Sequence, residues 1–502
     1  MSYFNDKYKS IIEEPRDISH LLKDNMTLIS GDFYGIQKFI FERLSTQKAS
    51  KVLRAKSAFV QIFTEYMAKY ICKSLSIEEC ILSMNAGKFE ILIPHQELDI
   101  KTVQKSLDDY FIKNFYGLSG MSLCATFCQK EDFKHTDRHR ALREKIDEEI
   151  EESRFKKFDL KETKAVLKYD TNIDNTSLCR VCNIRKKEKE ENCSICNNFI
   201  ELGRKLTKEA SQYYKADFLD TKNPIKIPLD KKIKSYIPKS DKDEALDFGE
   251  IAQNALGVEA LGVLKADVDS MGKFIKDEGI INSFEKFDSF SKSLDAFFSL
   301  YIVDRLKSDY PDYPNIYTVF TGGDDLFLIG AWSEIVAFAR DIREEFVTYT
   351  NNKLTLSFGI AIAKPSTPLS YLAEYSEELL EKSKEIDDDK DAITLFGETV
   401  KWKRYRCVFK KLDRLFKDFE DEKFEVIKTA TLYTLLELCE MSKNIDKEIR
   451  NTMWKSKLNY LFARNIDTKY HYILEDLNNV IEKNPRETKM FLSEFIYKRR
   501  ET

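Results

Sequence analysis

Short apolar runs separated by polar or glycine-containing breaks predict β-strands in two regions of the chain. In the first region these runs lie near residues 26–31, 80–84 and 89–94, and in the second near 260–266 and across 316–331. Apolar residues at helical spacing predict helices between and after these strands. The pattern is therefore typical of an α+β protein.

The second region continues with a predicted helix at 332–349, a strand at 354–362 and a helix that ends near residue 386. Before the 316–331 pair lies an aromatic stripe at helical spacing, which indicates core packing rather than a cofactor site. Its members are Phe287, Phe290, Leu294, Phe297, Phe298 and Tyr301. From Lys401 onward there is no glycine and a single proline, and leucines repeat at helical spacing, which predicts a C-terminal helical bundle.

The break within 316–331 reads Gly-Gly-Asp-Asp and carries the most informative chemistry. Gly322 and Gly323 are expected to supply the positive φ of a tight hairpin, which places Asp324 and Asp325 at its tip. Two carboxylates at a rigid tip can bind divalent cations against phosphate oxygens. An ordinary hairpin whose turn uses Gly and Asp is the alternative interpretation.

A second acidic position follows the strand at 260–266, where Asp267 and Asp269 end an apolar run. A strand with an Asp, a helix and an acidic hairpin is the order found in a nucleotidyl-transferring palm. There, carboxylates from neighbouring strands hold two metals about 3.5–4 Å apart. One metal activates the attacking 3′-hydroxyl, and the other screens the leaving pyrophosphate.

The two regions are predicted to be copies of one domain. Aligning Asp32 with Asp267 also aligns a Lys-Phe-Ile tripeptide in each copy, and a nearly equal offset lays Lys88-Phe89 over Asp324-Asp325. A repeat this long indicates duplicated domains rather than a solenoid. The first copy is expected to bind nucleotide or to pack against the second, but not to hold catalytic metal through its hairpin.

Four cysteines form two Cys-x2-Cys pairs separated by ten residues, the spacing of an all-cysteine zinc knuckle. They are Cys179, Cys182, Cys193 and Cys196. Four protein ligands leave no open position, so we expect a structural Zn²⁺, and the charged tip at 185–191 suits a solvated loop. Most of the other cysteines are expected in the core; these are Cys72, Cys80, Cys124, Cys128, Cys407 and Cys439.

Length and composition predict a multidomain protein of the cytoplasm. The 502 residues suffice for three to four domains; 42% are hydrophobic and 33% are charged. Met1 to Asn25 shows no signal-peptide pattern, and no apolar run approaches the roughly 20 residues of a membrane span, so disulfides are not expected. The net charge of −4 does not suit a free-standing nucleic-acid binder, so RNA contact would need a local basic surface or partner subunits.

The predicted fold is α+β, with two ferredoxin-like palm domains, a linker domain that carries the zinc knuckle, and a C-terminal helical bundle. The expected segments are an N-terminal lead at 1–24, the first palm at 25–150, the linker at 151–256, the second palm at 257–398 and the bundle at 399–502.

Together these motifs resemble the large subunit of type III-A CRISPR interference complexes. The resemblance rests on the Gly-Asp-x-x-Gly-Ile-Gln-Lys-Phe-Ile sequence that begins at Gly31, the four-cysteine knuckle, the Asp-Val-Asp at 267–269 and the Gly-Gly-Asp-Asp hairpin; it covers about residues 25–400. It implies an RNA-activated synthase that works with other effector-complex subunits, a guide CRISPR RNA and a target RNA. Such an enzyme joins ATP into 3′–5′ cyclic oligoadenylates with Mg²⁺ or Mn²⁺, as second messengers in antiviral defence.

The resemblance also implies roles for individual residues. The matching catalytic and metal-binding carboxylates are Asp267, Asp324 and Asp325, with Asp269 as a further metal ligand. The nucleotide-binding positions are Ser57, Ser291, Gly322, Gly323 and Lys384. Ser57 and Ser291 match serines that contact adenine, and Lys384 matches a triphosphate-binding lysine. The alternative readings are helix-surface hydroxyls for the serines and a solvated helix face for the lysine.

The chain departs from that family at its N-terminal region and at Tyr34. Its members often begin with an HD nuclease that cuts single-stranded DNA, whereas the first predicted strand here starts near Met26 and none of the five histidines precedes an Asp. HD-type DNase activity is therefore expected to be absent. His135 and His139 are spaced to bind metal together, but a charged helix face is the preferred interpretation. Tyr34 stands where family members often carry Ser.

Two other functions remain open at the level of sequence. A diguanylate cyclase shares the palm and an acidic hairpin, but the second palm copy, the zinc knuckle and the Asp325-Leu326 pair argue against it. A non-catalytic scaffold subunit would use the helical tail for docking, and the retained acids argue against that. Dimeric product from GTP would favour the first alternative, and the absence of any product would favour the second.

Overall fold

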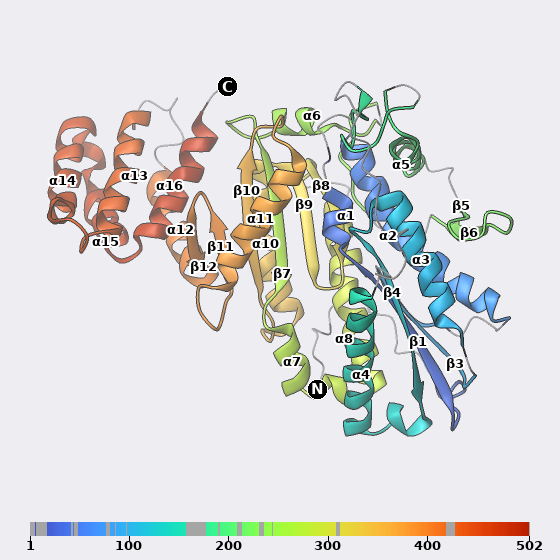
Figure 1. Ribbon diagram of the computed structural model, residues 1–502. Helices are drawn as coiled ribbons and strands as arrows, with labels where there is room; N and C mark the ends of the chain where they lie inside the picture. The colour runs from blue at the N-terminus through green and yellow to red at the C-terminus, as the bar shows by residue number, and fades with distance from the viewer. Residues whose placement is uncertain are drawn as a thin grey trace.

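The computed structural model arranges the chain as two β-sheet domains side by side, with a helical domain beyond the second sheet (Figure 1). It describes residues 6, 18–41, 44, 49–76, 81–85, 87–96, 98–156, 177–188, 191–207, 213–229, 235–242, 244–307, 312–417 and 427–500. The predicted α+β class is confirmed, with two palm-type sheets, a four-cysteine cluster between them in sequence and helices at the C-terminus.

The first domain is a four-stranded antiparallel sheet in the order β2-β3-β1-β4. Its strands are β1 (Met26–Tyr34), β2 (Ile81–Asn85), β3 (Lys88–Pro94) and β4 (Gly120–Cys128). Its helices are α1 (Ile36–Phe41), α2 (Ala49–Ser74), α3 (Ile100–Phe115) and α4 (Thr136–Phe155), with a 3₁₀ turn, η2, at Lys130–Phe133. Helices α2 and α3 join the core on one sheet face, and α4 covers the other face with Leu142, Ile146 and Ile150.

The second domain is a six-stranded sheet in the order β12-β11-β10-β7-β9-β8. Its strands are β7 (Leu261–Val268), β8 (Ile316–Gly322), β9 (Asp325–Ala331), β10 (Leu356–Ala363), β11 (Ala392–Leu395) and β12 (Glu398–Lys401). Its helical elements are α7 (Met271–Asp277), η5 (Ile280–Asn282), α8 (Phe284–Asp295), the π-helical turn η6 (Ala296–Tyr301), α9 (Ile302–Lys307), α10 (Trp332–Tyr349) and α11 (Leu369–Lys384). The predicted aromatic stripe does pack in the core, as Phe290, Phe297 and Phe298 are buried.

The predicted duplication is confirmed by strand order, because β2-β3-β1-β4 and β8-β9-β7-β10 have the same topology. The register corrects one detail of the sequence alignment. Asp32 pairs with Lys88 and Asp267 pairs with Asp325, so Lys88 occupies the position of Asp325 rather than that of Asp324. Phe89, which the sequence alignment placed over Asp325, is instead a buried core residue one step further along β3.

The two domains share a core at their interface. The face of the second sheet that carries Tyr317 and Phe327 joins the core of the first domain. The rings of Phe41 and Phe327 lie 4.4 Å apart, and the Tyr317 hydroxyl donates to the Ser50 carbonyl at 3.1 Å. Asp267 and Asp325 lie on this same face, because strand residues two apart point the same way. The acids therefore face the first domain.

The linker adds α5 (Ser194–Lys205), the hairpin β5 (Tyr213–Ala216) and β6 (Ile225–Pro228), and α6 (Phe248–Gln253). Helix α5 packs on α2 so closely that a Cβ at Gly203 would lie 2.2 Å from the Lys51 carbonyl oxygen. Arg54 Nη1 donates to the Gly203 carbonyl at 2.9 Å, which ties the two helices together. The linker is thus built onto the first palm.

The C-terminal domain is helical, as predicted. It contains α12 (Trp402–Phe416), α13 (Thr429–Lys443), η8 (Ile449–Met453), α14 (Trp454–Asn465), η9 (Thr468–Ile473), α15 (Leu474–Lys483) and α16 (Pro485–Arg499). A separate leucine- and phenylalanine-rich core holds it together. The part of the chain that the structure describes contains no helix with the length and apolar content of a membrane span.

Candidate functional site: an acidic hairpin at the interface of two palms

The Gly-Gly-Asp-Asp sequence forms the predicted hairpin tip between β8 and β9. Gly322 pairs with Asp325 across the ladder, which leaves Gly323 and Asp324 as the two turn residues. Gly323 has φ +67°, a left-handed conformation that glycine adopts without strain. The expectation for Gly322 was wrong: it is the last residue of β8 and does not have a positive φ.

Asp267 and Asp325 lie directly opposite each other on the neighbouring strands β7 and β9, with Asp324 in the adjoining turn. Burial, and then the nearby carboxylates of Asp267 and Asp324, raise the pKa of Asp325 to about 7. Burial and Asp267 also raise the pKa of Asp324. Crowded, half-buried acids resist ionisation together, and a bound cation would relieve that cost. These three acids do not all lie within 4.8 Å of one another, a closeness that only the cysteine cluster reaches among the described residues.

Asp269 is not part of this acid group by its contacts. Its Oδ2 accepts a hydrogen bond from Thr355 Oγ1 at 2.7 Å and another from the Asp391 backbone N–H at 3.1 Å. The side chain is 4% exposed, and burial raises its pKa. Its carboxylate therefore joins the end of β7 to the β10 and β11 side of the sheet.

Lys384 ends α11 and forms an ion pair with Asp267, so the structure brings this predicted residue to the acids. Burial alone would lower the pKa of Lys384, but the hydrogen bond to Asp267 and the negative charges of Asp267, Glu381 and Asp325 together outweigh burial and raise it. Helix α11 reaches the sheet because β10 carries Gly359 there: a Cβ would lie 2.4 Å from the Ser376 carbonyl oxygen.

Lys265 is a further charged residue at this site that the sequence reading missed. It lies two residues before Asp267 on β7, is 3% exposed, and pairs with Glu377 of α11. Burial lowers the pKa of Lys265 to about 8, against the opposing pull of Asp325 and Asp267. A lysine inside an otherwise apolar strand was the available signal, because such a residue is almost never buried without a partner.

Ser57 and Ser291 occupy matching places in the two palms. Val60, one turn after Ser57 on α2, lies against the first hairpin, since a Cβ at Gly87 would be 3.8 Å from its side chain. Asp295, one turn after Ser291 on α8, accepts a hydrogen bond from the Gly323 backbone N–H at 3.5 Å. Each half-buried serine therefore lies one helical turn from the residue that meets its own hairpin.

The hairpin of the first palm presents basic rather than acidic chemistry. Lys88 Nζ lies 3.9 Å from Asp32 Oδ2, and Arg154 at the end of α4 also pairs with Asp32. The sequence reading recognised the loss of the hairpin acids but not the pairing of Arg154, which lies 122 residues from Asp32.

The four cysteines of the predicted knuckle do converge. The Sγ atoms of Cys179, Cys182, Cys193 and Cys196 all lie within 4.8 Å of one another, and all four residues are buried. Hydrogen bonds from the Cys182 thiol, and then from Cys193 and Cys196, lower the pKa of Cys179. Four closely spaced thiols, one already favoured as thiolate, suit a tetrahedral Zn²⁺.

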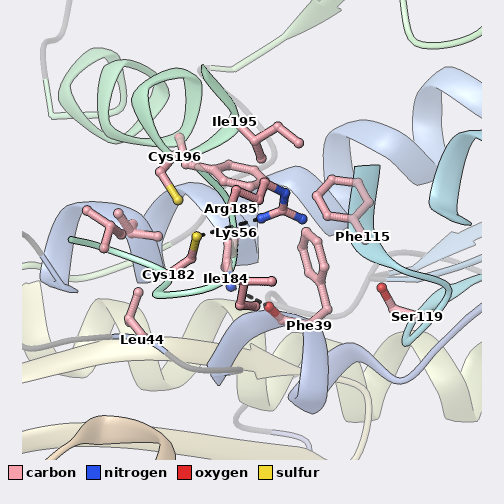
Figure 2. Close-up of a pocket in the computed structure, with 13 residues that line it drawn as sticks. Phe39, Leu44, Lys56, Phe115, Ser119, Cys182, Ile184, Arg185, Ile195 and Cys196 are labelled. Atoms are coloured by element: carbon pink, nitrogen blue, oxygen red, sulfur yellow. Dashed lines mark hydrogen bonds between the residues drawn. The ribbon is translucent and has the colours of Figure 1, made fainter. Parts of the chain in front are cut away.

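Arg185 connects this cluster to the first palm, so the tip between the cysteine pairs is not wholly solvated. Its guanidinium donates to Cys182 Sγ at 3.9 Å and to the Asn114 carbonyl, and lies 4.9 Å from the centre of the Tyr116 ring. Figure 2 shows Arg185 beside a cavity of about 30 Å³ that Phe39, Phe115 and Cys196 also line. This volume is enough for about one water molecule.

Other candidate residues have structural surroundings. His139 is fully buried and its Nδ1 hydrogen-bonds the Ile281 carbonyl at 2.6 Å, so the expected charged-face position was wrong for this histidine. His135 is exposed and pairs with Glu131 at 2.8 Å. Cys407 is exposed, contrary to the expected core position, whereas Cys72, Cys124, Cys128 and Cys439 are buried. Cys80 lies outside the described residues.

Two family models match the chain. Residues 260–394 match the second palm domain of Cas10/Cmr2, and residues 25–172 match domain B of the Csm1 subunit. A relative from Streptococcus thermophilus, named CRISPR system single-strand-specific deoxyribonuclease Cas10/Csm1 (subtype III-A), is 24% identical over 92% of this chain and 63% of its own length. A protein of the same name from Thermococcus onnurineus is 25% identical over 74% of this chain and 55% of its own length. The chain thus spans about six tenths of the length of these relatives.

Solved structures show the same fold. A Csm1–Csm4 cassette in complex with cA4 has a TM-score of 0.69 at 20% identity, over 96% of this chain and 71% of that chain. A cassette in complex with AMPPNP has a TM-score of 0.67 at 20% identity, over 94% of this chain and 70% of that one. The two family matches, which cover both palms, and the subtype III-A relatives agree: the chain belongs to the Cas10/Csm1 family of type III-A CRISPR systems.

Proposed function

We propose that this protein joins ATP into 3′–5′ cyclic oligoadenylates when the complex that contains it binds target RNA. The observation that carries the proposal is the placement of Asp267 and Asp325 in register on adjacent strands, with Asp324 in the turn beside them. That arrangement suits two-metal nucleotidyl transfer, in which the cations stabilise both the attacking and the leaving oxygen.

Each residue near the hairpin has a proposed part in this reaction. Asp267, Asp324 and Asp325 would hold Mg²⁺ or Mn²⁺, which supply charge stabilisation at the transferred phosphoryl group. Lys384, already at Asp267, would bind the triphosphate with its ammonium group. Gly323 supplies the positive φ of the turn, and the space beside it is open, since a Cβ there would meet nothing within 4 Å. The 3′-oxygen of one nucleotide then attacks the α-phosphorus of the next, and pyrophosphate leaves.

Two nucleotides must be held at once for this bond to form, and the paired palms suit that requirement. Ser57 and Ser291 lie at matching positions near the two hairpins, and we assign each to the adenine of the nucleotide in its own palm. Asp269 we assign to positioning rather than to metal binding, because its carboxylate already accepts hydrogen bonds from Thr355 and Asp391.

Partners are proposed from the related assemblies. The similar solved structures are cassettes of Csm1 with Csm4, and we propose that this chain likewise assembles with effector-complex subunits, a guide CRISPR RNA and a target RNA. Because the net charge of the chain is −4, much of the RNA contact is assigned to those subunits.

The cysteine cluster is proposed to hold one structural Zn²⁺. Elemental analysis should find one zinc per chain, and Cys179→Ser should lose it and lower the thermal stability of the first palm without changing nucleotide choice. Zinc retained at full stoichiometry in that variant would contradict the assignment.

Mass spectrometry of reaction products tests the main proposal. The assembled complex is incubated with ATP and Mg²⁺ or Mn²⁺, with matching target RNA or with a non-matching RNA as control. Cyclic adenylates that form only with matching target are expected. Intact ATP from a well-formed complex would contradict the proposal and favour a scaffold role, and a dimeric product made from GTP instead of ATP would favour a diguanylate cyclase.

A further inference from the structure

The hairpins of the two palms have matching positions and opposite charge. In the second palm, Asp267 faces Asp325; in the first, Asp32 faces Lys88 at the same place in the ladder. Gly87 takes the turn position of Asp324 in this register. The second palm therefore gathers three carboxylates at its hairpin, and the first has a lysine and a single acid.

A second basic residue strengthens this reversal. In each palm a helix follows the fourth strand of the repeat, namely α4 after β4 and α11 after β10. Arg154 in the last turn of α4 pairs with Asp32, just as Lys384 at the end of α11 pairs with Asp267. The first palm thus has two cations around one strand acid, whereas the second has one cation beside three hairpin and strand acids.

The two cations of the first palm are accessible. The Lys88 side chain is 71% exposed and that of Arg154 is 37% exposed, whereas Asp32 is 14% exposed beneath them. The Arg154 guanidinium also lies 6.0 Å from the centre of the Tyr34 ring, which limits its orientation. Asp147 of α4 and Asp324 of the second palm are the further acids on which the charge of Lys88 acts: it lowers the pKa of each, against the larger and opposite effect of burial.

Lys88 and Asp32 share a sheet face that meets the second palm. Lys88 lies on the same side of β3 as Leu92, and Asp32 on the same side of β1 as Leu28, because their positions differ by even numbers. Leu28 and Leu92 belong to a core that also contains Phe284 of the second palm. The basic pair is therefore on the side of the first palm that faces the other nucleotide site.

We propose that Lys88 and Arg154 form a phosphate-binding subsite in the first palm, which holds the triphosphate of a nucleotide without a divalent cation. The arginine fork can bind two phosphate oxygens at once, and the lysine adds a mobile point charge. This inference rests on the proposed function, because it assigns the second of the two nucleotides that the reaction needs. Metal dependence then belongs to the second palm alone.

Nucleotide binding in the presence of EDTA tests the subsite. The full-length protein, with Asp324→Ala and Asp325→Ala to disable the metal-dependent site, is titrated with AMPPNP by isothermal calorimetry. One nucleotide per chain is expected to bind without metal. Lys88→Met and Arg154→Met should each weaken that binding about tenfold or more, a fold-change that corresponds to about 1.4 kcal/mol. Lys88→Arg should retain it.

Lys156→Met provides the matched control, because Lys156 is also 71% exposed and lies two residues from Arg154, but pairs with Glu152 instead. It should bind AMPPNP like the parent protein. No binding in EDTA, or equal binding by the Lys88→Met and parent proteins, would overturn the subsite. The outcome is separate from that of the proposed function: target-dependent cyclic product without EDTA-resistant binding would leave the synthase standing and remove only the subsite.

Discussion

The two palms have the same strand order but differ at the hairpin where chemistry would occur. Matching strand pairs close the two hairpins, Asn85–Lys88 in one palm and Gly322–Asp325 in the other. The fold is maintained by apolar residues on the sheet faces, such as Phe89 and Leu326, which follow the tip residues inward and are fully buried. Charge at an accessible tip can therefore change without changing the fold, and this is why we propose a metal site in one palm and a phosphate site in the other.

The palms also differ in what supports them from outside. The first palm carries the linker, joined through Arg54 to α5 and through Arg185 to the end of α3. The second palm carries the helical tail, joined through Arg340 of α10 to Glu494 of α16 at 2.8 Å. Both supports are built around an arginine. The second is an ion pair between the half-buried Arg340 and the buried Glu494, whereas the first uses backbone carbonyls as acceptors.

The largest effect is expected from the acids of the second hairpin. Asp324→Ala with Asp325→Ala should lower adenylate synthesis more than about a thousandfold, because metal ions supply several kcal/mol and each 1.4 kcal/mol is tenfold in rate. Assembly with partner subunits should be unchanged, since both side chains lie at the tip. The measurements are product formation by mass spectrometry and complex formation by size-exclusion chromatography.

The matching acid of the first palm is the control. Asp32→Ala should reduce synthesis by less than about tenfold, because Asp32 has no second carboxylate opposite it with which to share a metal. Loss of synthesis as complete as in the hairpin variant would mean that both palms hold catalytic metal, and the comparison between them would fail.

The next largest effect is expected on stability, at the Arg340–Glu494 ion pair that joins the second palm to the helical tail. Glu494→Ala should lower the free energy of unfolding by about 1.5–3 kcal/mol, because it removes the charge-assisted hydrogen bonds that the half-buried Arg340 donates to this buried carboxylate. Chemical denaturation followed by circular dichroism measures this loss. Glu482→Ala is the control: Glu482 pairs with Lys455 at the surface, and its loss should cost no more than about 1 kcal/mol.

Low pH should weaken the same contact between Glu494 and Arg340. Burial alone would raise the pKa of Glu494, but the charges and hydrogen bonds of Arg340 and Lys498 together outweigh burial and lower the pKa to about 2. A carboxyl with a depressed pKa contributes stability above its unfolded pKa of about 4.5 and loses that contribution as pH falls toward 2. The Glu494→Ala variant should therefore lose less stability than the parent protein between pH 5 and pH 3.

Much of this architecture could be predicted from the sequence, because the spacing of apolar residues and the position of glycines determine strands, helices and turns locally. The strands around both hairpins and the helices α10 and α11 have the expected bounds within a few residues. Strand β4 was not predicted, since its mixture of small and polar residues gives no continuous apolar run and its place depends on pairing with β1. The hairpin β11–β12 was not predicted either, because its two strands have only four residues each and give no long apolar run.

The residues of the candidate site also fall into two groups, those that the sequence reveals and those that only the structure reveals. The hairpin acids are visible in the sequence because they are neighbours in the chain, and the repeat offset makes Asp267 visible as well. Arg154 and Glu377 are not, because each meets its partner across more than a hundred residues: Arg154 meets Asp32, and Glu377 meets Lys265. Long-range ion pairs depend on how helices cross a sheet, and a single sequence does not encode that crossing in any local pattern.

Charge reversal in the first palm gives the fourth prediction. Lys88→Asp places a carboxylate opposite Asp32 and restores the in-register acid pair of the second palm. Binding of AMPPNP in EDTA should fall by more than about tenfold, as one attractive charge becomes a repulsive one next to phosphate. In the background that lacks Asp324 and Asp325, Mn²⁺ binding measured by electron paramagnetic resonance should increase. Unchanged Mn²⁺ and nucleotide binding together would show that the charge at position 88 does not govern the first hairpin.

The smallest effects should come from Ser57 and Ser291. They extend the comparison of the two palms from the hairpins to the proposed adenine-binding positions. In the proposed assignment each serine makes one neutral hydrogen bond to adenine, worth about 0.5–1.5 kcal/mol. Ser57→Ala and Ser291→Ala should therefore each raise KM for ATP about two- to tenfold while kcat changes little. Because Ser57 lies in the first palm and Ser291 in the second, only Ser291→Ala should weaken the metal-dependent binding of AMPPNP, and only Ser57→Ala the binding in EDTA. Equal effects of both variants in both conditions would mean that the two pockets are one shared site, and that the opposite charges of the hairpins act on the same nucleotide.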